Sequence, residues 1–186
     1  MITLYKSLAC ILTVFLYIVM LRGDLKQNFV TWLFWVLLDA IALFSTIQEG
    51  GNYLVTLLYV CGGSVITIAI YCKGHAKWTW VEFATAGLVV ACLVVWYVYG
   101  SRVAIVVSTV AVCISALPMF YDFYKQPDVS VGLLYTGFTT VNVLFTLAGK
   151  NWSMKERFYP ASCAILCALL ALVSFRKLLG VKWCIR

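Results

Sequence analysis

The chain has 186 residues, of which 64% are hydrophobic and 11% charged, and its mean hydropathy is +0.99. This composition excludes a soluble globular domain and indicates an integral membrane protein. The formal net charge of +7 would suggest a nucleic-acid partner in a soluble protein, but the Lys and Arg residues lie almost entirely between apolar runs, so we expect the lipid bilayer as partner and no nucleic acid.

The apolar runs are mostly long enough to cross a hydrocarbon core of about 30 Å as helices. They lack the alternation of transmembrane barrel strands, and short polar segments rich in turn-forming residues separate them. We therefore predict an all-α polytopic membrane protein with seven transmembrane helices, at residues 5–21, 29–47, 53–72, 79–99, 103–124, 132–148 and 160–178.

The second run carries a carboxylate in an otherwise apolar stretch. Asp39 is the eleventh residue of the predicted helix 29–47, near the bilayer midplane, where exposure to lipid would cost at least about 2.5–3.5 kcal/mol. Its side chain is therefore expected to face the interior of the bundle. Asp39 either exchanges a proton during transport or receives a cationic or hydroxylated substrate; the alternative is a structural hydrogen bond to a buried Ser, Thr or backbone carbonyl.

The second and sixth runs share one pattern, aromatic-x-x-aromatic-x-x-x-polar. At a constant offset of 103 residues, Trp32, Trp35 and Asp39 are matched by Tyr135, Phe138 and Asn142. The spacing puts each set on one helix face. The fourth run has no counterpart, so we predict parallel 3+1+3 repeats: a first three-helix bundle at 1–78, a linker helix within 79–102, and a second three-helix bundle with a short basic tail at 103–186.

These two faces are the predicted substrate site. Asp39 and Asn142 would supply polar groups, and the four aromatic residues would supply walls for a planar or sugar-like ligand. Asn142 fits a role as interhelical glue equally well, and Trp32, close to a helix start, fits an interfacial aromatic belt. The eight cysteines lie nearly all within apolar runs without a CxxC pair, and there is one histidine, so we expect no metal and no cofactor.

The basic residues predict the orientation of the chain, since seven spans place its termini on opposite sides. The side of the N-terminus holds five and the other side nine: Lys6, Arg102, Lys150, Lys155 and Arg157 against Arg22, Lys26, Lys73, Lys77, Lys125, Arg176, Lys177, Lys182 and Arg186. The positive-inside bias predicts the N-terminus outside and the C-terminus in the cytoplasm.

Two segments carry a resemblance to a known family. Residues 116–125, ALPMFYDFYK, resemble the proline-glutamine loop of the PQ-loop superfamily, which includes the SWEET and PnuC transporters, with Met119 in place of the glutamine. Residues 17–26 and 30–35 are similar to small bacterial membrane proteins of the same fold, which implies a bacterial inner (plasma) membrane. The resemblance implies two three-helix bundles, a central site and alternating access by rocking of the halves.

The chain also departs from the SWEET pattern. Pro118 is the one proline within a span and the candidate gating hinge, whereas Val19 stands at the matching place in the first helix. The asparagines that SWEET proteins present to a sugar from helices 3 and 7 have no counterparts here, so the resemblance does not extend to a sugar.

The sequence thus predicts a transporter or facilitator of a small polar solute that works by alternating access. The alternative is a non-transporting membrane receptor or assembly factor on the same fold. HExxH, GxSxG and His-Cys sets are missing from the sequence, so no enzyme is expected. Association of the chain into a homo-oligomer is left open.

Overall fold

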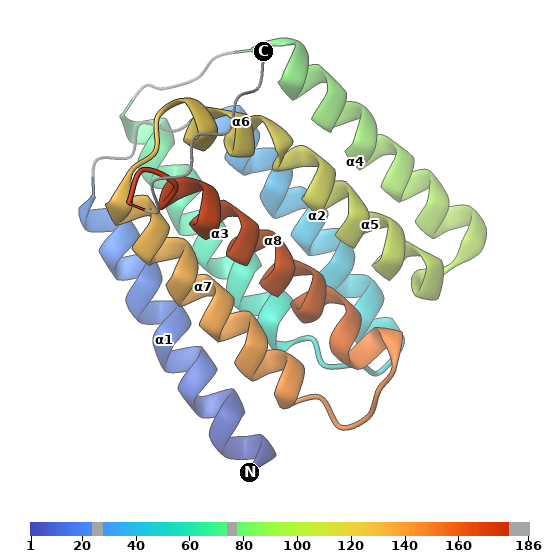
Figure 1. The fold of residues 1–186 in the computed structure, drawn as a ribbon. Coiled ribbons are helices and arrows are strands. Elements are labelled where there is room, and N and C mark those ends of the chain that lie inside the picture. The colour runs from blue at the N-terminus through green and yellow to red at the C-terminus, as the bar shows by residue number, and fades with distance from the viewer. Residues whose placement is uncertain (24–27, 74–77, 179–186) are drawn as a thin grey trace.

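The computed structural model describes residues 1–23, 28–73 and 78–178, and all regular secondary structure in them is helical (Figure 1). The helices are α1 (Ile2–Arg22), α2 (Phe29–Gln48), α3 (Leu54–Cys72), α4 (Trp80–Tyr99), α5 (Ser101–Ser115), α6 (Leu117–Lys125), α7 (Val129–Leu147), a π-helical turn η1 (Met154–Phe158) and α8 (Tyr159–Ser174). In these residues seven helical spans are long and apolar enough to cross a membrane, with α5 and α6 forming one span and η1 and α8 another. The prediction of seven apolar spanning helices is confirmed. Lys26, Lys77, Lys182 and Arg186, used above for orientation, lie outside the described residues.

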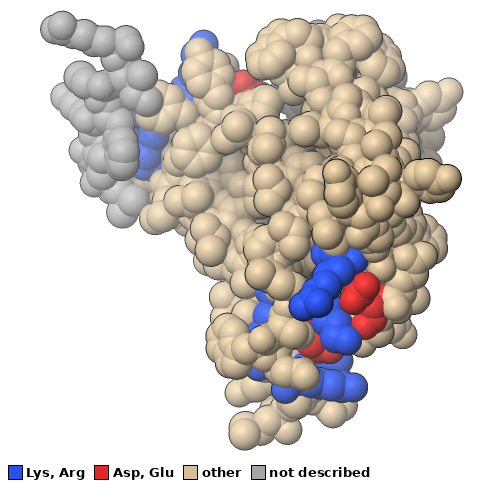
Figure 2. Space-filling view, turned by 90° about the vertical axis from the view of Figure 1, so that its right-hand side faces the viewer, with Lys and Arg blue, Asp and Glu red and all other residues tan. Residues whose placement is uncertain are grey.

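The surface agrees with burial in a bilayer. Large apolar side chains on the outside of the bundle are well exposed, among them Ile11 at 69%, Phe83 at 65% and Ile68 at 62%. On the face drawn in Figure 2, charged side chains form separate groups with a wide expanse of uncharged residues between them. Because such a surface would be unfavourable in water, the structure indicates an integral membrane protein.

The fifth and seventh spans differ from the single continuous helices predicted for them. α5 ends at Ser115 and α6 begins at Leu117, because Pro118 has no N–H to donate to the carbonyl four residues earlier. The last span starts at Met154 rather than at the predicted 160, as the π turn η1. That turn is held to the end of α2, where Lys155 Nζ donates to the Glu49 carbonyl at 2.8 Å.

For description we call α1, α2 and α3 the first group of helices and α5, α7 and α8 the second group; the helices of the two groups pack side by side (Figure 1). In the first group α3 packs against both α1 and α2, and in the second group α8 packs against both α5 and α7. Between the groups α1 packs against α7, and α2 packs against α5. Helix α4 lies outside the two groups, against α5 and α2.

Helix α4 is hydrogen-bonded to α2 near both of its ends. Glu82, in a capping box with Thr79, accepts hydrogen bonds at 2.8 Å from Asn28 Nδ2 and from Thr31 Oγ1 at the start of α2. At the other end Trp96 Nε1 donates to Gln48 Oε1 at 3.1 Å. These bonds hold α4 on the first group of helices.

The connection from α4 to α5 is a single residue. Gly100 adopts φ +79°, a left-handed conformation that residues with a Cβ rarely take. Just after it, Ser101 Oγ donates to Glu49 Oε1 at 2.9 Å, which links the start of α5 to the end of α2. The ends of α2 and α4 and the start of α5 are therefore fastened together at one face of the bundle.

Two consecutive glycines let α3 approach its neighbours closely. A Cβ added to Gly62 would lie 2.1 Å from the ring of Tyr17 on α1, and one added to Gly63 would lie 2.9 Å from a methyl group of Val36 on α2. Both distances are far shorter than van der Waals contact. The packing of α1, α2 and α3 therefore depends on the absence of side chains at these two positions.

We expect Gly62→Ala to lower the free energy of unfolding in detergent by about 1–3 kcal/mol, because the ring of Tyr17 has to move away from α3. The matched control is Gly87→Ala in α4, where an added Cβ meets no atom within 4 Å. That change should be neutral or slightly stabilising, since Ala favours a helix over Gly. Equal effects of the two substitutions on the thermal unfolding midpoint would contradict this account of the packing.

Candidate functional site

A cavity of about 100 Å³ lies between the two groups of helices. All three helices of the first group line it, and so do α5, α7 and α8 of the second group, but α4 contributes no residue. At about 30 Å³ for each water molecule in the liquid, a volume of this size corresponds to roughly three water molecules. The cavity is therefore large enough for a small solute.

Two tyrosine hydrogen bonds cross the centre of the molecule between the groups. Tyr159 at the start of α8 donates to Asp39 Oδ1 on α2 at 2.5 Å, and Asn142 Nδ2 on α7 donates to the hydroxyl of Tyr59 on α3 at 2.5 Å. The rings of Tyr59 and Tyr159 lie 6.2 Å apart between their centroids. Each bond thus joins the middle helix of one group to the third helix of the other, and the two bonds lie next to each other.

Asp39 faces the interior of the bundle, as its sequence position led us to expect. It lines the cavity and is only 9% exposed. Its hydrogen-bond partner is the phenol of Tyr159, not the Ser, Thr or backbone carbonyl considered for a structural role. The other carboxyl oxygen, Oδ2, makes no hydrogen bond within the part of the chain that the structure describes.

Asn142 does not line the cavity. It is completely buried behind Phe138 and Tyr59, with Nδ2 also donating to the Phe138 carbonyl at 2.8 Å. Phe138 lies one turn earlier on the same face of α7 and, unlike Asn142, forms part of the cavity wall. Asp39 and Asn142 therefore do not face each other across the cavity; each is bound to a tyrosine.

The four aromatic residues of the predicted site all line the cavity. The rings of Trp32 and Trp35 lie 5.5 Å apart, and those of Tyr135 and Phe138 lie 6.3 Å apart. Trp32 is buried, which favours a position in the predicted site over a position in an interfacial aromatic belt. Nε1 of Trp35 is buried and has no hydrogen-bond partner among the described residues.

Sequence reasoning missed five residues of the cavity wall: Tyr17, Tyr59, Tyr159, Cys163 and Cys167. A signal for the tyrosine pair was present. Tyr59 is the sixth residue of α3, and Tyr159 is the sixth residue of the span Met154–Ser174. A hydroxyl at the same register in the third helix of each group is a natural partner for a buried carboxyl or amide.

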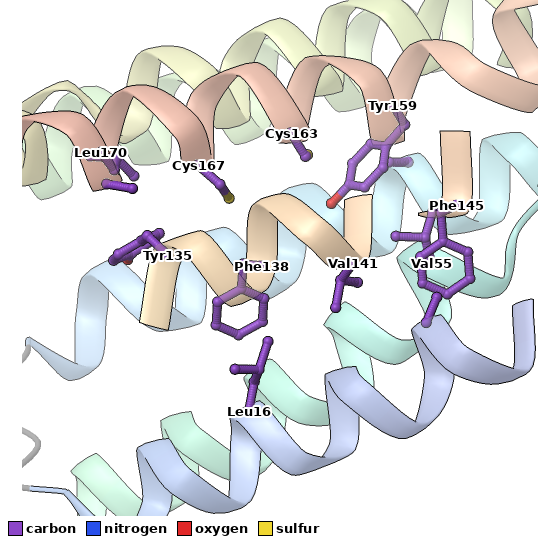
Figure 3. Close-up of a cluster of buried hydrophobic side chains, with 13 residues drawn as sticks. Leu16, Val55, Tyr135, Phe138, Val141, Phe145, Tyr159, Cys163, Cys167 and Leu170 are labelled. Atoms are coloured by element: carbon purple, nitrogen blue, oxygen red, sulfur yellow. The ribbon is translucent and has the colours of Figure 1, made fainter. Parts of the chain in front are cut away.

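The cavity is closed at one end. From Asp39 it extends toward Met20, Trp32 and Leu170, which lie near the ends of their helices on the side of the 125–129 connection. On the other side of the tyrosine pair, Val55 and Phe145 are completely buried (Figure 3). The tyrosine bonds thus stand between the cavity and a dry apolar layer.

Pro118 lies in the first turn of α6, two residues beyond Ala116, which lines the cavity. The break between α5 and α6 is therefore adjacent to the site. Comparisons of the chain with protein-family models, with curated proteins and with solved structures found no match.

We expect a double-mutant cycle of Asp39→Ala and Tyr159→Phe to give a coupling free energy of about 0.5–2 kcal/mol in unfolding measurements in detergent. The reason is that either change alone removes the bond of 2.5 Å between the two side chains. The control cycle pairs Asp39→Ala with Tyr97→Phe, since Tyr97 is 94% exposed on α4. There the two effects should add, and a coupling equal to that of the first cycle would show that Tyr159 does not act through Asp39.

Proposed function

We propose that the protein is a transporter or facilitator of a small polar solute, which works by alternating access at the cavity between the two helix groups. The observation that carries this proposal is the position of the cavity: it touches all six helices of the two groups and ends at a pair of hydrogen bonds between them. A site at the interface of two bodies is reached from the other side when those bodies tilt against each other.

The packing supports the proposed 3+1+3 repeat and the resemblance to the PQ-loop superfamily. In both groups the third helix packs against the first and the second, and the first helix of each group packs against the middle helix of the other. The tyrosine bonds follow the same reciprocal scheme. Two repeats related by an axis along the membrane normal would produce this arrangement, with α4 as the linker.

The closed end gives the proposal a direction. The cavity extends from Asp39 toward the side that holds the 125–129 connection, while the dry layer around Val55 and Phe145 lies toward the side of the N-terminus. With the N-terminus outside and the C-terminus in the cytoplasm of a bacterial cell, this is a state whose site lies toward the cytoplasm. Passage to the outside requires both tyrosine bonds to open, and the helix break at Pro118 is the proposed hinge.

Native cysteines make the proposed change of access measurable. We expect a charged, water-soluble methanethiosulfonate reagent to modify a variant that keeps only Cys163 and Cys167 from the side of the 125–129 connection, because both thiols line the cavity. Tyr159→Phe removes the hydrogen bond to Asp39, so it should raise the rate of modification from the opposite side severalfold. A variant that keeps only Cys61, which is exposed on the outside of α3, should not react. If the side from which the reagent modifies these thiols never changes under any condition, the transport proposal is contradicted. The alternative function on this fold, a non-transporting receptor, is then favoured.

In proteoliposomes, we expect Asp39→Asn to reduce uptake of the transported solute at least tenfold or to shift the pH dependence of uptake, with the expression level unchanged. The substitution keeps the shape of Asp39, the only carboxyl among the described residues of the cavity wall, but removes its charge. The control is Asp122→Asn, which removes an exposed carboxyl on α6 outside the cavity. Uptake and pH profile identical to wild type in Asp39→Asn would exclude the assigned role of Asp39.

A further inference from the structure

The charge on the cavity wall is one-sided. Asp39 contributes a carboxyl, and no Lys, Arg or His is present among the described residues that line the cavity. Oδ1 accepts from Tyr159, whereas Oδ2 has no hydrogen-bond partner within the described ranges 1–23, 28–73 and 78–178. An ionised carboxylate in such a place needs a positive charge that the wall does not supply.

Aromatic rings surround this carboxyl. Tyr59 and Tyr159 lie beside it with centroids 6.2 Å apart, and the ring of Phe138 lies 6.1 Å from Tyr59 and 5.6 Å from Tyr17. All of these rings line the cavity. Aromatic faces attract ammonium groups, and a set of them around an acid is the composition of sites for organic cations.

These features exclude other classes of ligand. An anion would meet only the negative charge of Asp39. A sugar would bury more hydroxyl groups than the largely apolar wall can pair. A bare metal ion needs several oxygen, nitrogen or sulfur ligands, and no group of three acidic, His or Cys side chains that could hold one occurs among the described residues.

We propose that the cavity binds a small organic monocation through its ammonium group. The ammonium group lies against Asp39 and the rings of Tyr59, Phe138 and Tyr159. The volume of about 100 Å³ holds roughly four non-hydrogen atoms, the size of a trimethylammonium group. This inference rests on the proposed function only in taking the same cavity as the solute site.

The test is equilibrium binding to the purified protein of three molecules of one shape: choline, its uncharged isostere dimethylbutanol, in which carbon replaces nitrogen, and the anion dimethylbutanoate. Binding is followed by calorimetry and by the fluorescence of the tryptophans, two of which line the cavity. We expect choline to bind at least tenfold more tightly than the alcohol, and the anion not to bind. Equal or tighter binding of the alcohol or the anion, or no binding of choline, would overturn the proposal.

Two substitutions locate the binding. Asp39→Asn should bring choline and the alcohol within about threefold of each other, whereas the control Asp122→Asn should keep the tenfold preference. Phe138→Leu should weaken choline severalfold but leave the alcohol unchanged, because it removes one aromatic face from the wall. A choline preference that survives Asp39→Asn would overturn the assignment to this cavity. If Asp39→Asn does not fold, the wild-type series and Phe138→Leu decide the question.

The proposed cation binding and the proposed transport can be contradicted independently of each other. The binding series needs no change of access, so its failure alone leaves the proposed transport to be judged by uptake and by cysteine modification. Choline binding with the expected preference, but without solute flux under any condition, would keep the cation site and overturn the transporter.

Discussion

The centre of this protein is organised by the need to satisfy one carboxyl inside a bundle whose outer surface is apolar. Asp39 cannot face lipid without a large cost, and none of the described residues on the cavity wall around it is basic, so its partner is a neutral donor from another helix. Tyr159 supplies that donor from α8 at 2.5 Å. The bond brings together two helices from different groups, and the amide of Asn142 repeats the scheme with Tyr59 in the other direction. The contact between the two halves is therefore polar at its midpoint and apolar toward the end where Val55 and Phe145 lie.

This arrangement explains why a cavity exists beside the bonds. Long aromatic side chains that reach across the interface hold the middle and third helices of opposite groups at a distance, where small side chains would let them collapse together. The glycines at 62 and 63 have the opposite effect within the first group, since they let α3 move close to α1 and α2. Close packing inside the first group and aromatic spacing between the groups leave free volume at the interface, which is where the proposed solute site lies.

Much of the fold follows from local sequence, and much of the site does not. Apolar run lengths define the seven spans, and the position of Asp39 in its run is enough to turn it inward. Pro118 also marks where the fifth span breaks, although the run 103–124 reads as continuous. The partners of Asp39 and Asn142 could not be read in this way, because hydrogen bonds between residues 120 and 83 positions apart depend on how the helices are placed around one another. The placement of the helices also decides the position of Asn142. Asn142 and Phe138 lie on one face of α7, but the packing of α3 against that face decides which of them reaches the cavity.

The single-residue connection at Gly100 has a mechanical consequence. Together with the bond between Ser101 and Glu49, it fastens α5 to the ends of α2 and α4 at one membrane face, whereas the bonds of Glu82 at the opposite face join α4 to α2 and not to α5. A joint of this kind is a fulcrum. On a helix of about 20 residues, which is about 30 Å long, a tilt of about 10° at the fulcrum moves the far end by roughly 5 Å. The lever arm is longest on the side toward which the cavity extends, so small rotations at Gly100 become displacements there as wide as a solute.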